Sequence, residues 1–200
     1  MTATGEASIA PNLAVVRFGV TGTGKDLGPS RDEVNTRSSA VLAQLRDLGL
    51  ADGDVNAPDV EIQPEYDYRR GQKLIGYRVV RQMTARVRQL DRLGDVLDGI
   101  VAAGANEVQG VAMTASDPSA AEHAALAAAV TAARAKAEAI AAAAGVTMGA
   151  LVRVEEGDGP GMPQPKMRMM DMAESADVPT EVAVGDLTVT RRIRAWFALG

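Results

Sequence analysis

The chain has 200 residues, no Cys, a hydrophobic content of 46% with only 3% aromatic residues, and a formal net charge of -5 with a pI near 5.0. The absence of Cys excludes disulfides, thiol catalysis and Cys-based zinc sites. The net negative charge argues against nucleic acid and anionic membranes as partners, because binding to either needs surplus Lys and Arg.

The first third of the sequence predicts a strand followed by a helix. Apolar residues alternate from Leu13 to Thr21, which is typical of a strand, and a shorter extended segment over residues 3–9 precedes it. Residues 22–28 are rich in Gly and predict a flexible exit from the strand. A capping-box pattern then predicts a helix that begins at Ser30 and is stopped by Gly49.

The next segment predicts a long hairpin, a second helix and a further strand. Residues 60–68 and 74–88 alternate with period two, and Pro64, which lacks an amide hydrogen, favours an edge position for the first of these strands. An apolar stripe with helical spacing covers residues 91–104, and a strand pattern covers residues 107–114. The apolar stripes of the two helices need a sheet to cover.

A long alanine-rich helix has the clearest start and stop signals. Asp117 lies where an N-cap is expected, Pro118 takes the first helical position, and the helix runs through Ala144 until Gly145 stops it. The larger apolar side chains predict its buried side: Leu126, Val130 and Ile140. Whether the remaining alanine surface contacts another subunit stays open.

The last third predicts two strands with an irregular segment between them. Residues 150–155 and 187–199 have strand patterns, and Trp196 falls on the polar side of the second. The segment between them collects Gly, Pro, Met and acidic residues without either period. We therefore expect a flexible, Met- and Pro-rich insertion at about residues 157–182.

In chain order these elements give β-α-β-β-α-β, the split ferredoxin-like arrangement, followed by a long helix and two further strands. We predict an α+β fold in which an antiparallel sheet carries the helices on one face. The sequence contains neither a Pro/Ser linker nor an internal repeat. We therefore predict a single domain over residues 1–200.

Several strings of residues carry a family resemblance. They are Gly5-Glu6 with Ala10-Pro11, Gly76-Tyr77-Arg78, residues 90–104 with the Ala-Gly-Ala-Asn that closes this stretch, residues 116–145, and Val184-Gly185-Asp186-Leu187. Together they cover nearly the whole chain. In these strings and their spacing the chain resembles the SIMPL domain family, the YggE-like proteins found mainly in bacteria. The Met-rich stretch over residues 162–172 departs from the shared pattern.

The resemblance implies structural or interaction roles more than catalysis. It also implies a homo-oligomer, ring-like or channel-like, a role in stress protection, and a periplasmic or secreted location. No catalytic residue or cofactor is carried over, and a protein partner stays unspecified. We expect no membrane span, because no apolar run is long enough to cross a bilayer. The chain as given shows no signal peptide, and an export signal removed ahead of it stays open.

Residues 19–25 have the spacing of a phosphate-binding loop, but two features argue against one. Asp26 stands where the motif needs a Ser or Thr hydroxyl for magnesium. The following helix is predicted to begin only at Ser30, too late for its amides to hold phosphate. We therefore predict a Gly-rich turn here.

An acidic stretch imitates a calcium loop. Its oxygen-bearing residues are Asp52, Asp54, Asn56, Asp59 and Glu61. The match breaks because Ala57 stands where the sharp turn needs Gly and Gln63 stands where a bidentate Glu is needed. A solvated acidic loop is the favoured interpretation.

A cluster of methionines lies in the predicted insertion. Thioether sulfur is a soft ligand that suits Cu(I), but no His or Cys accompanies it. A metal site, a contact with a partner or another subunit, and a segment without a role all stay open. The weak candidate ligands are Met162, Met167, Met169, Met170 and Met172.

No side chains in the sequence have the pattern of a nucleophile and its base, and the only His, His123, has just Glu122 beside it. We predict a non-enzymatic exported protein that acts through homo-oligomerisation or partner binding. The alternative is a ligand-binding module that uses the Met-rich segment for a soft metal or a small molecule. A hydrolase with carboxylates that cannot be paired from the sequence is a third hypothesis.

Overall fold

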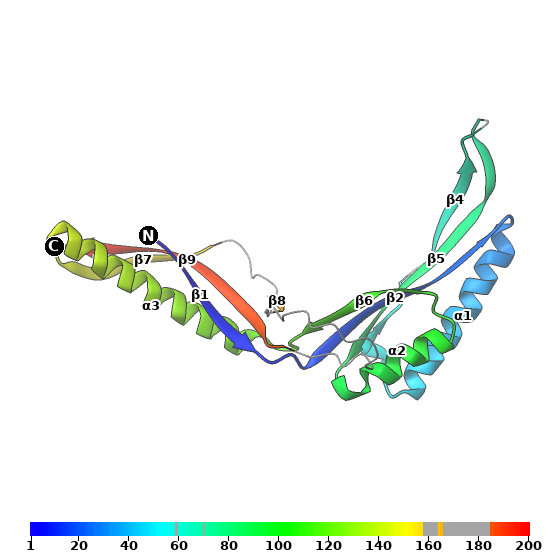
Figure 1. The fold of residues 1–200 in the computed structure, drawn as a ribbon, viewed down its shortest axis with the longest axis horizontal. Helices are drawn as coiled ribbons and strands as arrows, with labels where there is room; N and C mark the ends of the chain where they lie inside the picture. The colour runs from blue at the N-terminus through cyan, green and yellow to red at the C-terminus, as the bar shows by residue number, and fades with distance from the viewer. Residues whose placement is uncertain (59, 70, 158–163, 166–184) are drawn as a thin grey trace, which may run out of the picture. The chain divides into compact units, whose positions relative to one another are not determined.

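The computed structural model describes residues 1–58, 60–69, 71–157, 164–165 and 185–200 (Figure 1). Their contacts group the chain into two compact units. The terminal unit consists of Met1–Pro11 with Thr114–Gly200, and the central unit is Asn12–Met113. The prediction of a single domain stays a prediction, because compactness does not show whether the units unfold together.

The central unit contains one sheet and two α-helices. Its elements are β2 (Leu13–Gly24), α1 (Leu27–Asp47), β3 (Val55–Asn56), β4 (Glu61–Asp67), β5 (Lys73–Val87), α2 (Leu93–Ala102) and β6 (Glu107–Thr114). The strand order is β3-β5-β2-β6, and β4 also pairs with β5. Because β5 lies between β2 and β4, this unit has the predicted split β-α-β-β-α-β arrangement.

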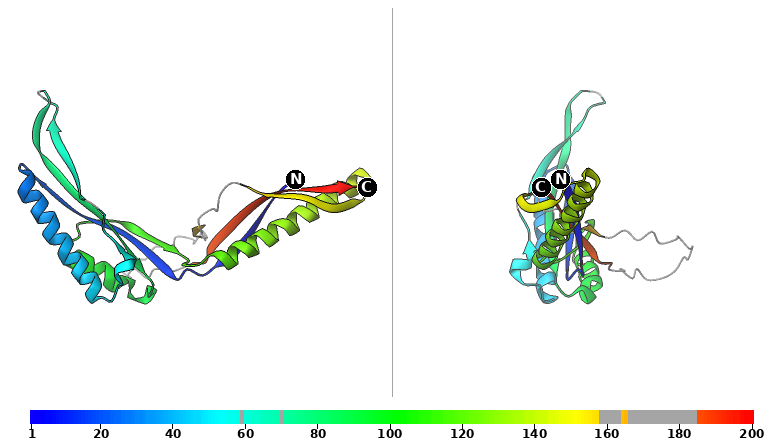
Figure 2. Two further views of the ribbon diagram at one scale, coloured as in Figure 1. Left: turned by 180° about the vertical axis from the view of Figure 1, so that it is seen from behind. Right: turned by 90° about the vertical axis from the view of Figure 1, so that its left-hand side faces the viewer.

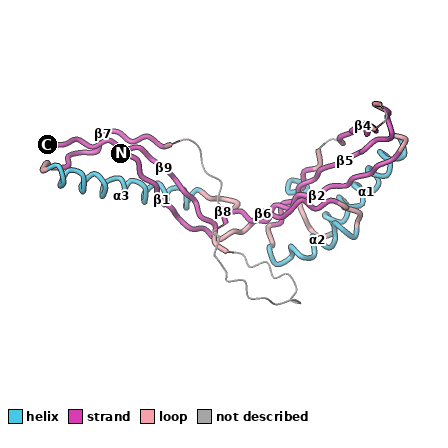
Figure 3. The backbone as a smooth tube through the Cα atoms, turned by 45° about the horizontal axis from the view of Figure 1, so that its top comes forward, coloured by secondary structure: helices cyan, strands magenta, loops and turns pink. Residues whose placement is uncertain are grey.

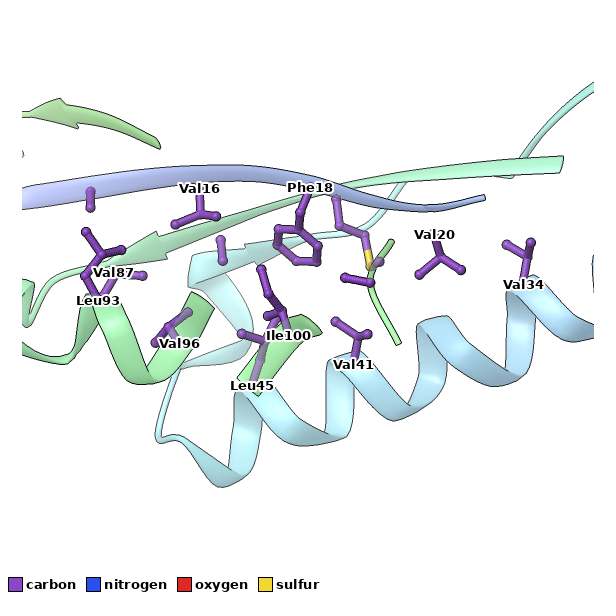
Figure 4. Packing of buried hydrophobic residues seen from close by; sticks show 14 of the residues in the cluster. Val16, Phe18, Val20, Val34, Val41, Leu45, Val87, Leu93, Val96 and Ile100 are labelled. Atoms are coloured by element: carbon purple, nitrogen blue, oxygen red, sulfur yellow. The ribbon is translucent and has the colours of Figure 1, made fainter. Parts of the chain in front are cut away.

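The core of the central unit lies between the sheet and both helices. Alternate residues of β2 point to one face, and Phe18 is fully buried there. Figure 4 shows Val16, Phe18 and Val20 directed toward Val41 of α1 and Ile100 of α2. The period-two and period-3.6 patterns of the sequence therefore meet in one hydrophobic core.

The Gly-rich segment after Thr21 is strand rather than the predicted turn. Gly22 pairs with Val79 and Gly24 with Tyr77, so β2 continues to Gly24. Helix α1 begins at Leu27, before the predicted start at Ser30, whose Oγ donates to the Asp26 carbonyl inside the first turn at 3.1 Å. The prediction failed because glycine residues can form strand hydrogen bonds where a neighbouring strand, here β5, lies alongside.

The β4–β5 hairpin confirms the predicted edge. β4 pairs with β5, and Pro64 lies opposite Tyr77. β5 begins at Lys73, ahead of its pairing with β2, which starts at Tyr77 and runs to Val87 (Figure 3). Most of β4 is exposed, so this strand is less buried than the predicted half-buried pattern.

The terminal unit contains the second sheet and the longest of the described helices. Its elements are β1 (Thr2–Ile9), α3 (Ser119–Ala144), β7 (Met148–Glu156), β8 (Gln164–Pro165) and β9 (Leu187–Leu199). The strand order is β1-β9-β7, and β8 also pairs with β9. Mixed helices and antiparallel pairs confirm the α+β class. The described strands form two sheets where one was expected, because β1 pairs antiparallel with β9 along its whole length instead of extending β2.

Helix α3 packs on β1 and β9 (Figure 2), and its buried side chains there are small. Its buried residues recur every four positions: Ala121, Ala125, Ala129, Ala133, Ala137 and Ala141. The predicted buried side is therefore wrong for Ile140, which is 55% exposed, while Leu126 and Val130 are only partly buried. Alanine occupies this face because the strand backbone comes too close for larger side chains.

Both ends of α3 carry the expected capping groups. Asp117 Oδ1 accepts a hydrogen bond from the Ser119 amide at 3.0 Å, and hydrogen bonds from Ser119 lower the pKa of the Asp117 carboxyl. Gly145 takes a left-handed conformation with φ of 71°. The first helical residue is Ser119, one position after the predicted Pro118.

Candidate functional site

The edge strand β7 is the most exposed apolar strand of the terminal unit. Every residue of β7 is at least partly exposed, and Val152 is 69% exposed. Among the strands that the structure describes, β7 is paired with β9 alone. We use the name β7 surface for the exposed apolar side chains of this strand and of the adjacent end of β9: Leu151, Val152, Val154, Trp196 and Leu199.

Charged side chains border the β7 surface. The Arg153 guanidinium lies over the Trp196 ring, with its Cζ 5.3 Å from the ring centroid, and also pairs with Glu155. Register irregularities interrupt the β7–β9 pairing on both sides of Leu151. Trp196 is exposed, as its place on the polar side of the strand pattern predicted.

Arg191 is a buried charge that the sequence interpretation missed. It is only 4% exposed and lies on the buried face of β9, between Val189 and Ile193. Its Nη2 lies 2.5 Å from Oε1 of Glu122 in the first turn of α3, and its Nε lies 3.6 Å from Oε1 of Glu156 at the end of β7. One guanidinium therefore joins three elements of the terminal unit.

We use the name Arg191 clasp for Arg191 with its two partners, Glu122 and Glu156. The sequence contained a signal for this clasp. In β9 the apolar positions recur every second residue, and Arg191 occupies one of them. A charge at such a position is buried and needs partners. Glu122 is one of those partners. Its neighbour His123 is an exposed residue of the helix surface.

The central unit contains a groove of about 470 Å³ near the end of β5 and the start of α2. Its walls combine apolar side chains with three arginines: Arg86, Arg88 and Arg92. Arg88 binds Asp54 through two hydrogen bonds, of 3.0 Å from Nε and 2.8 Å from Nη2. The hydrogen bond from Arg88 is the main reason that the pKa of the Asp54 carboxyl is lowered.

The described residues of the acidic stretch that imitates a calcium loop either form ion pairs or lie on strands. Asp52 pairs with Arg46 at 2.9 Å and Asp54 pairs with Arg88, while Asn56 and Glu61 lie on the separate strands β3 and β4. Asp59 lies outside the described residues. Across the part of the chain that the structure describes, no three His, Asp or Glu side chains are grouped to hold a metal ion.

The remaining predicted positions fall in two places. Residues 19–24 of the phosphate-loop imitation belong to β2, so they form no loop that could surround a phosphate. The candidate soft-metal ligands lie outside the described residues: Met162, Met167, Met169, Met170 and Met172. Most of the predicted insertion at 157–182 lies there too. The hypothesis of a metal or small-molecule site in this segment stays a prediction.

Two antiparallel sheets, three α-helices in the described residues, an exposed edge strand and a basic groove define an α+β protein with several candidate interaction surfaces. Residues 1–197 match the family model SIMPL, described as a protein of unknown function (DUF541). The chain therefore belongs to the SIMPL family, and the resemblance found in the sequence is confirmed.

Individual relatives agree with this assignment. The chain is similar to the uncharacterized protein YggE of Escherichia coli strain K12, at 29% identity over 87% of this chain and 72% of the relative. It is 32% identical to the YggE protein of Edwardsiella ictaluri, over 86% of this chain and 74% of the relative. It is 30% identical to the 26 kDa periplasmic immunogenic protein of Brucella abortus, over 93% of this chain and 78% of the relative.

Three of the strings that carried the resemblance have a structural reason. A Cβ on Gly5 would overlap the backbone of α3, and a Cβ on Gly76 would lie 2.7 Å from the Gly24 carbonyl oxygen. Asn106 closes the Ala-Gly-Ala-Asn string, and its side-chain amide exchanges two hydrogen bonds of 2.8 Å with the backbone of Thr21. These residues serve close packing and strand pairing. No helix within the described ranges is both long and apolar enough to cross a membrane.

Proposed function

We propose that this protein is a non-enzymatic, exported member of the SIMPL family that acts by self-association through the β7 surface. The observation that carries the proposal is the exposed apolar edge of β7, with Val152 as its most exposed side chain. A single exposed apolar residue needs no explanation, but an edge strand that is exposed along its length and carries three large apolar side chains favours pairing with another chain.

The chemistry of the edge suggests how two copies would meet. The outer side of an edge strand offers a row of backbone N–H and C=O groups that a second β7 can pair with. In a twofold arrangement the same apolar side chains meet across the new strand pair, so each copy buries Leu151 and Val154 along with Val152. Burial of apolar area then supplies the free energy of association, and backbone pairing sets the register.

Size-exclusion chromatography with light scattering tests this proposal over a range of protein concentrations. We expect an oligomer for the unmodified chain and a monomer for Val152→Lys, because a Lys on an edge strand opposes pairing of edges. Val108→Lys is the matched control, since Val108 is an exposed residue of β6 in the central unit. It is expected to leave the mass unchanged.

Two results would contradict the proposal in different ways. A strict monomer at high concentration for the unmodified chain would remove self-association itself. Dissociation by Val108→Lys but not by Val152→Lys would keep self-association and remove β7 as its surface.

Export and a role under stress are further parts of the proposal. The name of the Brucella abortus relative calls that protein periplasmic, which supports a periplasmic or secreted location for this family member. Cell fractionation of the native protein tests the location, and recovery in the cytoplasmic fraction would contradict it. Survival of a deletion strain under oxidative and envelope stress, compared with the parent strain, tests the stress role.

A further inference from the structure

The arginine-lined groove of the central unit has the form of a small-molecule site. Its volume of about 470 Å³ falls within the range of about 300–1,000 Å³ that is common for ligand pockets. The apolar residues that line it include the half-buried Leu48 and the buried Val87 and Val96. Such a lining favours a ligand with an apolar body over a fully hydrated ion.

The charges around this groove have a surplus of one sign. Three arginines line it, whereas Asp54 is the only acidic residue among the lining residues. The Asp54 carboxylate is only 13% exposed and is held by Arg88, so this pair is balanced internally. Arg86 and Arg92 supply two further positive charges, in a chain whose net charge is -5.

The two surplus arginines differ in how they are held. Arg92 Nη1 donates to the Leu48 carbonyl at 2.9 Å, which fixes the guanidinium at the groove without neutralising its charge. Arg86 is exposed on β5 and close enough to Asp54 to contribute to its lowered pKa. A fixed and an exposed guanidinium at one groove suit an anionic head group.

Helix α2 adds to the positive potential at this place. It begins at Leu93, directly after Arg92, and Val96 in its first turn lines the groove. The N-terminus of a helix carries a partial positive charge, which favours an anion nearby. The helix end supports the site that the cavity and the arginines already outline.

We propose that this groove binds an amphipathic organic carboxylate, a molecule with one anionic head and a single hydrocarbon chain. The head pairs with the guanidinium groups of Arg86 and Arg92, because their planar donors match the two oxygens of a carboxylate. The hydrocarbon chain covers the apolar wall beside Val87 and Leu48. This site lies in the central unit and does not depend on self-association through β7.

Isothermal titration calorimetry with decanoate at low ionic strength tests this site in the full chain. We expect saturable binding of one decanoate per chain. Arg86→Glu is expected to weaken binding by about tenfold or more, because it replaces an attractive charge at the groove by a repulsive one. Arg86→Lys keeps the charge and is expected to retain most of the affinity. Arg17→Glu is the matched control, since Arg17 is an exposed strand residue of the same sheet that does not line the groove.

Two more variants separate the charged part of the groove from its apolar part. Asp54→Asn releases Arg88 from its carboxylate partner and is expected to tighten decanoate binding. Ala51→Phe places a ring in the groove from an exposed position and is expected to abolish binding while circular dichroism stays that of the unmodified chain.

Other probes identify the chemistry that is recognised. Decanol and inorganic phosphate are expected to bind much more weakly than decanoate, because decanol lacks the anionic head and phosphate lacks the hydrocarbon chain. Equal affinity for decanol would mean apolar adsorption only, and equal affinity for phosphate would mean a simple anion site. Either result, unchanged decanoate affinity in Arg86→Glu, or no decanoate binding by the unmodified chain would overturn the proposal.

Discussion

Gly5 of β1 lies directly against the backbone of Ala125 in α3, so closely that a Cβ on Gly5 would overlap the Ala125 carbonyl oxygen. The neighbouring backbone atoms of Ala128 and Ala129 would also be in the way. This contact explains both the glycine in the strand and the alanines on the helix, because any larger side chain would separate the two elements.

The first prediction concerns this contact. Gly5→Ala is expected to lower the free energy of unfolding by about 2 kcal/mol or more, since the obstructing atoms are backbone and cannot turn aside. Urea unfolding measures the change.

Gly28→Ala is the control, because no atom lies within 4 Å of a Cβ at that helical position. Its expected effect is within about 1 kcal/mol and stabilising in sign. A Gly5→Ala protein as stable as the unmodified chain would show that β1 and α3 are not in close contact.

The buried face of α3 shows where reasoning from side-chain size fails. The start and stop signals around Asp117 and Gly145 located the helix to within about one residue, because capping is local chemistry. The buried side was predicted from the largest apolar residues, and Ile140 is instead exposed. Helical periodicity shows which residues share a face of the helix. Which face is buried depends on how closely the strand backbone approaches the helix, and at Gly5 the approach leaves room only for alanine.

The division into two sheets has a similar cause. Alternation predicted β5, β6 and β9 closely, because period two is a property of each strand alone. It does not say which strands become neighbours. Thr2 pairs with Arg194 at the far end of the chain, and the patterns of β1 and β9 do not encode that choice. Asn106 is similar: its position in a family string was visible, but its bonds to Thr21 depend on β2 and β6 being adjacent.

The second prediction concerns the Arg191 clasp. Arg191→Met is expected to lower the free energy of unfolding by about 3 kcal/mol, because it leaves the carboxylates of Glu122 and Glu156 without their shared partner. This value is at the lower end of the usual range, since both carboxylates retain contact with solvent. Thermal unfolding and urea unfolding both measure the loss.

Arg192→Met provides the control for that measurement. Arg192 is the next residue of β9 and is exposed on the opposite side of the strand. Its substitution is expected to change the free energy of unfolding by no more than about 0.5 kcal/mol. Equal effects of the two substitutions would show that Arg191 makes no special contribution.

The third prediction is a pH dependence that belongs to Asp54. Its folded-state pKa is lowered below the ordinary value of an aspartate carboxyl, chiefly by the hydrogen bond from Arg88. The unfolded chain therefore binds the proton more tightly than the folded one. The stabilising contribution of Asp54 is fully present above the unfolded pKa and is lost as pH falls through the lower, folded pKa.

Urea unfolding of the unmodified chain and of Asp54→Asn, from about pH 7 to about pH 2.5, measures that contribution. The difference between the two proteins is expected to be constant above about pH 5 and to shrink below about pH 4. Arg88→Gln is expected to remove most of the same pH-dependent part, and the double variant to add little more. A difference between the two proteins that does not change with pH would exclude the Asp54–Arg88 pair as its source.

The fourth prediction is that the two units unfold together, as the expected single domain requires. The central unit is inserted between β1 and α3, so the terminal unit joins segments from both ends of the chain. If the central unit unfolded alone, it would become a flexible loop of roughly 100 residues whose closure costs the terminal unit about 4 kcal/mol. That cost is a large share of the stability of an ordinary domain.

Trp196 is the only Trp and reports on the terminal unit, while far-UV circular dichroism reports on both units. We expect the two signals to give one coincident urea transition, and separated midpoints would show that the units are independent domains.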